Sequence, residues 1–187
     1  MKITVTGFEP FGGSARNASW EAVRQLRDVD TVMLPVSFER ACRMIREIAA
    51  GDADAVICVG EAAGRDRISV ERIAVNLMDA RIPDNDGYQP ADVPVCPGRP
   101  DGWFTTLPVR RILEETEDTE ISYTAGTYVC NAVFYSLMDE INLRGNRTKG
   151  GFIHVPAGGM PPEKILGGLK SILDCVRSET EKGRLSV

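Results

Sequence analysis

Residues 55–59, Ala55-Val56-Ile57-Cys58-Val59, form a near-continuous apolar run. A strand that is apolar on both of its faces is typical of a parallel sheet that helices cover on both sides. Outward from this run, strand-like and helix-like patterns alternate along the chain in both directions. Such alternation favours an α/β sandwich with a largely parallel sheet.

The expected elements can be placed along the whole chain. Apolar β-rich runs predict strands near 3–6, 31–36, 55–59, 68–77 (with an irregularity near Glu71), 121–123 and 151–155. Helical spacing of apolar residues predicts helices near 19–26, 39–50, 108–115, 130–143 and 162–178. The proline-rich stretch 78–102 is expected to be mostly loop. We therefore expect one domain over residues 1–187, a three-layer sandwich with a twisted, mostly parallel sheet between helices and a frayed tail at 181–187.

The composition argues against several classes of protein. Hydrophobic residues make up 43% and charged residues 26% of the 187, as in folded globular domains rather than disordered chains. No apolar run approaches the ~20 residues that span a bilayer, and the start of the chain is too soon interrupted for a signal peptide. The net charge is −5 with scattered Lys and Arg, which argues against a nucleic-acid surface. We expect a cytoplasmic protein with no nucleic-acid or membrane partner.

The cysteines and the histidine count point the same way. Five cysteines are widely spaced without a CxxC pair, so a disulfide framework is not expected and a cytosol would keep the thiols reduced. A structural zinc site requires clustered thiolates or several histidines, and this chain has one histidine. The sequence therefore predicts neither a metal nor another cofactor. The cysteines are Cys42, Cys58, Cys96, Cys130 and Cys175.

Cys130 stands where a loop turns into the predicted helix 130–143. A helix N-terminus offers free N–H groups and a positive dipole end, which stabilise a thiolate and an oxyanion. This position is compatible with a reactive cysteine whose thiol pKa is lowered. It is equally compatible with a buried structural cysteine, the commonest environment of a free thiol.

His154 lies near the end of the predicted strand 151–155. In parallel α/β sheets, functional sites gather at the carboxyl ends of the strands. An imidazole is the usual base that activates a thiol near neutral pH, and any such base in this chain must be His154. A carboxylate that orients the ring would complete a triad, but spacing alone cannot choose it among 27 acidic residues.

Three longer motifs carry a resemblance to a known family. They are Thr6-Gly7-Phe8-Glu9-Pro10-Phe11-Gly12-Gly13 with Asn17-Ala18-Ser19-Trp20; Gly60-Glu61-Ala62-Ala63-Gly64-Arg65, continuing through Ile68-Ser69-Val70-Glu71-Arg72-Ile73-Ala74-Val75-Asn76 to Asp79-Ala80-Arg81-Ile82-Pro83-Asp84-Asn85; and Ser122-Tyr123-Thr124-Ala125-Gly126-Thr127-Tyr128-Val129-Cys130-Asn131, followed by Phe152-Ile153-His154-Val155-Pro156. In these motifs the chain resembles pyroglutamyl peptidase I (pyrrolidone-carboxylate peptidase), a family of cysteine peptidases. The resemblance implies an exopeptidase that removes N-terminal pyroglutamate from peptides through a covalent thioester, and a homo-oligomer, either dimer or tetramer.

The resemblance also implies individual roles. It makes Cys130 the nucleophile, His154 the base and then the acid, and Glu71 the carboxylate that orients the ring. It places the pyrrolidone ring of the substrate between two aromatic side chains and surrounds it with further pocket residues. The implied substrate-binding residues are Phe8, Phe11, Asn17, Arg81, Ile82, Tyr128 and Val129. Without the resemblance, the two phenylalanines are typical of core packing and Arg81 of a solvated loop.

Three positions depart from the pattern of the family. Glu61 stands where many members have glutamine, Tyr128 replaces a common phenylalanine, and Ala18 replaces a proline. The first two leave open an amidase for another small lactam or acyl amide. A third alternative is a catalytically inactive binding or assembly module, although the intact set Cys130, His154 and Glu71 argues against it.

Overall fold

The computed structural model describes residues 1–145 and 147–185, with residues 180–185 described by their backbone alone. Its main sheet has six strands in the order β2-β1-β3-β8-β4-β7 within that part of the chain. Neighbouring strands pair in parallel except β4 and β8, which are antiparallel. The strands are β1 (Ile3–Phe8), β2 (Asp30–Leu34), β3 (Ala55–Ala62), β4 (Ile68–Glu71), β7 (Thr119–Ser122) and β8 (Lys149–Pro156).

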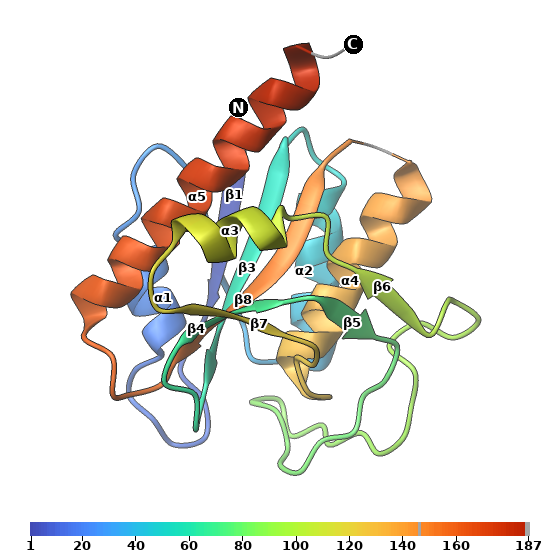
Figure 1. Cartoon of the computed structure of the whole chain (residues 1–187). Helices are drawn as coiled ribbons and strands as arrows, with labels where there is room; N and C mark the ends of the chain where they lie inside the picture. The colour runs from blue at the N-terminus through green and yellow to red at the C-terminus, as the bar shows by residue number, and fades with distance from the viewer. Residues whose placement is uncertain (146, 186–187) are drawn as a thin grey trace.

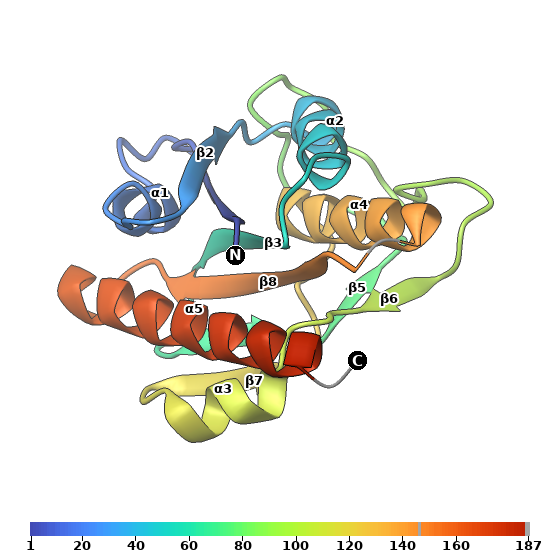
Figure 2. The ribbon, with the colours of Figure 1, turned by 90° about the horizontal axis from the view of Figure 1, so that it is seen from above.

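Helices cover both faces of this sheet, as Figures 1 and 2 show. In the view from above, α2 and α4 lie on one side of β3 and β8, and α5 and α3 lie on the other (Figure 2). The buried residues of α1 join the core of α3 and α5. The expected α/β sandwich with a mostly parallel sheet is therefore confirmed. The helices are α1 (Ala18–Val23), α2 (Phe38–Ala49), α3 (Val109–Glu115), α4 (Val129–Arg144) and α5 (Pro162–Leu185).

A small sheet of two antiparallel strands packs beside α4 and corrects one expectation. The stretch 68–77 is not a single irregular strand: β4 ends at Glu71, and β5 (Ile73–Val75) pairs with β6 (Gly102–Phe104) in a second sheet. The chain changes partners at Arg72, whose N–H donates to the Ser122 carbonyl at 2.7 Å and whose carbonyl accepts from Thr105 at 3.1 Å. Strand β6 lies at the end of the stretch that was expected to be mostly loop.

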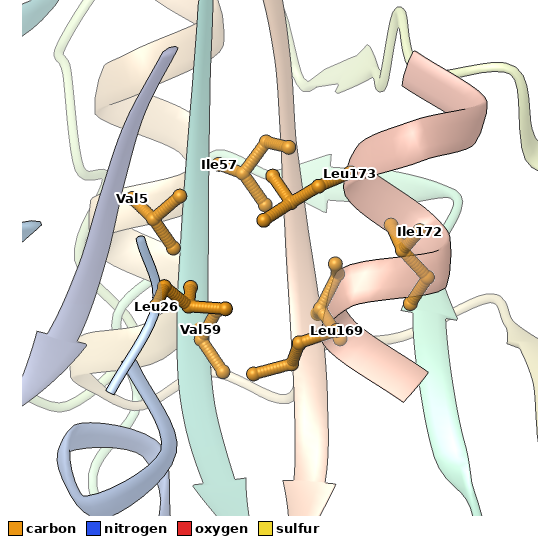
Figure 3. A pocket seen from close by; sticks show the side chains of 8 residues that line it. Val5, Leu26, Ile57, Val59, Leu169, Ile172 and Leu173 are labelled. Atoms are coloured by element: carbon orange, nitrogen blue, oxygen red, sulfur yellow. The ribbon is translucent and has the colours of Figure 1, made fainter. Parts of the chain in front are cut away.

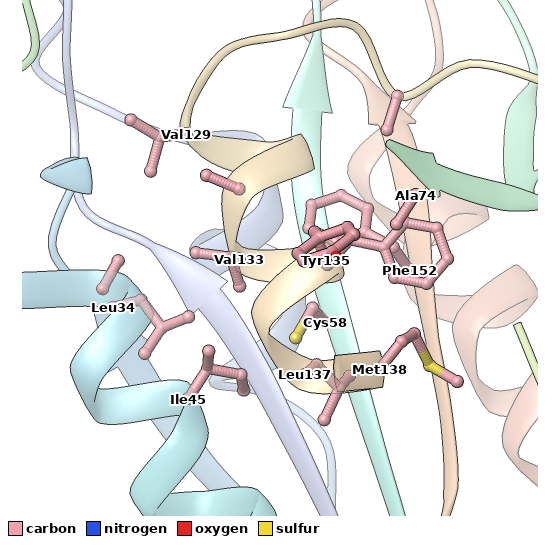
Figure 4. Packing of buried hydrophobic residues seen from close by; sticks show 14 of the residues in the cluster. Leu34, Ile45, Cys58, Ala74, Val129, Val133, Tyr135, Leu137, Met138 and Phe152 are labelled. Atoms are coloured by element: carbon pink, nitrogen blue, oxygen red, sulfur yellow. The ribbon is translucent and has the colours of Figure 1, made fainter. Parts of the chain in front are cut away.

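Two apolar cores lie on the two faces of the sheet. The core under α2 and α4 contains Ile45, Cys58, Tyr135 and Phe152, among other fully buried side chains (Figure 4). The core under α5 contains a small cavity between this helix and strands β1, β3 and β8 (Figure 3). Since only aliphatic side chains line this cavity, it offers no partner for a polar ligand.

The ends of several elements differ from the sequence prediction. Helix α5 was expected to end near residue 178 and to be followed by a frayed tail at 181–187. Its backbone is helical to Leu185, and residues 186–187 lie outside the described part of the chain. Among the described residues, no helix has both the length and the apolar character needed to cross a bilayer.

Candidate active site

The centre of the candidate site is a bond between the histidine and one carboxylate. Glu71 ends β4, and His154 lies on the neighbouring antiparallel strand β8. The Nδ1 of His154 lies 2.7 Å from Oε1 of Glu71, and both side chains are buried. Because both residues belong to strands inside the main sheet, the sheet itself fixes their spacing.

Cys130 approaches this pair from helix α4, of which it is the second residue. No side chain of the described residues caps the first turn of α4, so backbone N–H groups remain free there. The side chain of Asn131 anchors the helix start to the end of β5 and the residues after it. It accepts a bond from the Val75 N–H at 3.0 Å and donates to the carbonyls of Val75 and Leu77, both at 2.9 Å. The N-terminus of α4 is therefore held at a fixed place above the sheet.

Gly60 lies next to both the Cys130 thiol and the strand of His154. It pairs with His154 in the register of β3 and β8. A Cβ at position 60 would lie 2.9 Å from the Cys130 Sγ and 2.7 Å from Cζ of Phe152. The Phe152 ring in turn lies 4.8 Å from the His154 ring, measured between centroids. The structure thus places the predicted imidazole in contact with the carboxylate, and the thiol next to Gly60, the β3 partner of His154.

Burial sets the protonation of the thiol and the imidazole. It is the main cause that raises the pKa of Cys130 to about 12, and the negative charge of Glu71 adds to it. This direction is opposite to the lowered thiol pKa expected from the helix N-terminus, because burial of the thiol outweighs the effect of the helix dipole. Burial also lowers the pKa of His154, against the opposing effect of Glu71. Thiol and imidazole are both uncharged at neutral pH.

Arg65 is a member of the site that the sequence analysis did not single out. Its Nη1 lies 2.8 Å from Oε1 of Glu71, the same oxygen that contacts His154. Its Nη2 donates to the carbonyl of Thr124 at 3.1 Å and to the hydroxyl of Ser122 at 3.3 Å. The one available signal was its place in the second motif, directly after Gly64, whose φ of +78° turns the chain.

Glu61 and Asn17 organise the loop between β1 and α1. Oε2 of Glu61 accepts a bond from the backbone N–H of Ala18 at 2.6 Å. Oδ1 of Asn17 caps α1 by accepting from the N–H of Ser19 at 3.0 Å, and its Nδ2 donates to the Glu9 carbonyl at 3.0 Å. The two glutamates near the thiol therefore have different contacts: Glu71 contacts the imidazole, whereas Glu61 supports the loop that carries Phe11.

The aromatic residues of the predicted pocket lie in two separate groups. Phe8 is buried, and its ring packs 6.2 Å from that of Phe152. Phe11 is partly buried and lies 6.2 Å from the ring of Tyr128, which packs edge-on against Phe38 at 5.4 Å. The Tyr128 hydroxyl donates to the Pro83 carbonyl at 2.9 Å, so the residue that replaces phenylalanine has a partner for its extra polar group.

The other predicted pocket residues lie at the start of α4 and on the stretch between β5 and β6. Val129, the first residue of α4, is buried in the core under that helix. Arg81 and Ile82 are exposed on the stretch between β5 and β6. Two bonds between Asp79 and Thr127 tie this stretch to the segment before α4, at 3.1 Å and 2.7 Å. Within the described residues, no three His, Cys, Asp or Glu side chains form a group that could hold a metal ion.

Comparisons with known proteins show the family. The family model described as pyroglutamyl peptidase matches residues 1–172. The chain is 46% identical over 167 residues to the pyrrolidone-carboxylate peptidase of Thermococcus onnurineus, with 83% of this chain and 84% of that protein covered. It is 43% identical over 167 residues to that of Bacillus subtilis strain 168, with coverage of 83% and 78%.

Solved structures show the same fold. The crystal structure of pyroglutamyl peptidase I from Bacillus amyloliquefaciens superimposes with a TM-score of 0.90 at 40% identity, and the match covers 94% of each chain. A mutant pyrrolidone carboxyl peptidase from Pyrococcus furiosus also gives a TM-score of 0.90, at 35% identity, with 96% of this chain and 99% of that chain covered.

Proposed function

The chain belongs to the pyroglutamyl peptidase family of cysteine peptidases, and we propose that it removes the N-terminal pyroglutamyl residue from peptides with Cys130, His154 and Glu71 as a catalytic triad. The observation that carries this proposal is the 2.7 Å contact of His154 with Glu71, together with the place of Cys130 at the start of α4, next to Gly60, the β3 partner of His154. An ionised carboxylate only accepts hydrogen bonds, so the imidazole proton lies on Nδ1 and Nε2 is free to receive the thiol proton.

Acylation starts from the uncharged thiol and imidazole. The Cys130 sulfur attacks the carbonyl carbon of the scissile bond while Nε2 of His154 takes the thiol proton. Glu71 stabilises the imidazolium that forms. As the tetrahedral intermediate collapses, the C–N bond breaks and the leaving amine takes that proton. The pyroglutamyl group remains as a thioester on Cys130.

Deacylation reverses the roles with water as the nucleophile. His154 removes a proton from the water, whose oxygen attacks the thioester carbon. The C–S bond then breaks, free pyroglutamate leaves, and Cys130 recovers its proton from the imidazolium. In both steps the free backbone N–H groups at the start of α4 stabilise the developing oxyanion, and by family resemblance we assign a supporting role to Arg81.

The substrate pocket follows from the chemistry of the ring. Pyroglutamate is a neutral lactam without a free amino group, so a site that recognises it requires apolar walls and few hydrogen bonds. We assign the faces of the ring to Phe8 and Phe11 and the remaining wall to Ile82, Tyr128 and Val129, with Asn17 on the substrate side. By family likeness we also propose a cytoplasmic homo-oligomer, a dimer or a tetramer.

A fluorogenic pyroglutamyl amide tests this function directly. We expect turnover by the wild-type chain, loss of turnover after alkylation with iodoacetamide, and no turnover by a folded Cys130→Ala variant. Wild-type turnover in Cys130→Ala would disprove the mechanism. A wild-type chain that cleaves other small acyl amides but not this one would be a different amidase, and a chain inert to all of them would be a binding module.

A further inference from the structure

One carboxylate oxygen, Oε1 of Glu71, contacts both His154 and Arg65. The imidazole Nδ1 lies at 2.7 Å from it and is hydrogen-bonded, and the guanidinium Nη1 lies at 2.8 Å as an ion pair without hydrogen-bond geometry. From this geometry we propose that Arg65 is a positioning residue of the catalytic site, which holds the buried Glu71 carboxylate in place against His154. This inference rests on the proposed triad and adds a fourth, cationic member to it.

The burial of Glu71 shows why the carboxylate needs a cation. Its side chain has no exposed surface, and its Oε2 makes no hydrogen bond among the described residues. A carboxylate in such surroundings is strongly destabilised unless an opposite charge lies beside it. His154 does not supply that charge, because burial lowers its pKa and keeps it neutral. Arg65 is always protonated and therefore does.

The second arm of the guanidinium fixes its place. Nη2 donates to the Ser122 hydroxyl at the end of β7 and to the Thr124 carbonyl in the segment that leads to α4. Only 22% of the Arg65 side chain is exposed. Arg65 thus links Glu71 on β4 to the segment that precedes Cys130. An exposed ion pair on the surface would not fix two segments in this way.

The charge of Arg65 also acts on the two reacting groups. It lowers the pKa of the His154 imidazole and of the Cys130 thiol, and so opposes Glu71 at both. Without Arg65 the His154 pKa rises, so the imidazole stays protonated, and inactive as a base, up to a higher pH. The acid limb of the activity profile therefore moves to higher pH.

The test compares Arg65→Met with Arg65→Lys and with Arg67→Met, a matched control at an exposed position two residues further along. We expect Arg65→Met to lower kcat by roughly 10- to 100-fold with little change in KM and to move the acid limb of kcat/KM upward by about 0.5–1 pH unit. Arg65→Lys keeps the charge and should retain the wild-type acid limb with part of the activity. A loss of kcat with an unchanged acid limb in Arg65→Met would reduce Arg65 to a structural role and overturn the proposal.

A second measurement does not depend on turnover. His154 is the one histidine of the chain, so its ring signals in an NMR titration need no further assignment. Its pKa should rise in Arg65→Met and stay near the wild-type value in Arg65→Lys and Arg67→Met. Equal pKa values in wild type and Arg65→Met would contradict the proposal, whereas failure of the wild type to cleave pyroglutamyl amides would contradict only the proposed function.

A double variant is informative when Glu71→Gln and Arg65→Met each lower kcat to a similar extent. In a Glu71→Gln background the carboxylate that Arg65 serves is gone, so adding Arg65→Met should cost less than about 2-fold in kcat. Losses that multiply would show that Arg65 acts without Glu71. If Arg65→Met does not fold, as judged by circular dichroism, the lysine variant decides: its His154 pKa must then match that of the wild type.

Discussion

Gly60 and Cys130 are packed so closely that position 60 has no room for a side chain. A Cβ there would lie 2.9 Å from the Cys130 Sγ, a distance that real Cβ atoms do not show. The first prediction is that Gly60→Ala displaces the thiol or the Phe152 ring and lowers kcat by about 100-fold, since shifts of about 1 Å have effects of this size. Turnover of a pyroglutamyl amide measures it.

The matched control for this substitution is Gly167→Ala in α5, where an added Cβ meets nothing within 4 Å. We expect full activity, and a slightly higher melting temperature because alanine favours the helix. Wild-type activity in Gly60→Ala would show that the site tolerates the shift.

The second prediction concerns the reactivity of the thiol. Because the pKa of Cys130 is raised to about 12, only a small fraction is thiolate at neutral pH in the free protein. The rate of iodoacetamide labelling at Cys130, followed by mass spectrometry of its peptide, should therefore keep rising above about pH 9. A plateau near neutral pH would instead reveal a preformed thiolate–imidazolium pair.

The third prediction is the position of the acid limb in the wild type. Burial lowers the pKa of His154, so the base stays neutral and active at pH values at which an ordinary imidazole is already protonated. The acid limb of kcat/KM should lie below about pH 6.5, the ordinary value for histidine. An acid limb clearly above that value would mean that the effect of Glu71 outweighs burial.

The fourth prediction compares the two acidic residues near the thiol. Glu71→Gln removes the partner of Nδ1 and should lower kcat by roughly 10²- to 10⁴-fold with a much smaller effect on KM. Glu61→Gln keeps an oxygen that can accept from the Ala18 N–H and removes a charge that raises the Cys130 pKa, so its activity should equal or exceed that of the wild type. The opposite ranking would assign the acid to Glu61.

The fifth prediction concerns specificity. Glutamyl and glutaminyl amides lack the lactam and carry charged groups, and prolyl amides keep a ring but lose the carbonyl and add an ammonium. Since an apolar pocket cannot solvate these charges, pyroglutamyl amides should be cleaved at least about 10³-fold faster, measured as kcat/KM. Similar rates on prolyl and pyroglutamyl amides would contradict the pocket.

The main features of the fold were visible in the sequence because they depend on local patterns. The apolar run at 55–59 predicted a strand buried on both faces, and β3 is such a strand. The second sheet, β5 with β6, was missed for a physical reason: Ile73 and Val75 alternate again after Ile68 and Val70 with a shift of one residue near Glu71. Such a shift is also typical of an irregular single strand, so it does not show that the chain changes sheets at Arg72.

The site was predictable only in part. Position and family resemblance singled out Cys130, His154 and Glu71; in the structure His154 contacts Glu71, and Cys130 lies next to Gly60, the β3 partner of His154. Arg65 has no comparable local signal, because its contact with Glu71 depends on how the loop between β3 and β4 folds. The raised pKa of Cys130 was also out of reach, since burial is a property of the packed protein and here outweighs the helix N-terminus.

The short stretch from Glu71 to Val75 holds two parts of the site at once. At one end the Glu71 carboxylate contacts His154, and at the other the backbone of Val75 bonds to Asn131, the residue next to Cys130. The same short piece of backbone therefore carries Glu71 and holds the helix start that carries Cys130. A local opening that detaches this piece disables both residues together, so amide hydrogen exchange along it would report the lifetime of the assembled site.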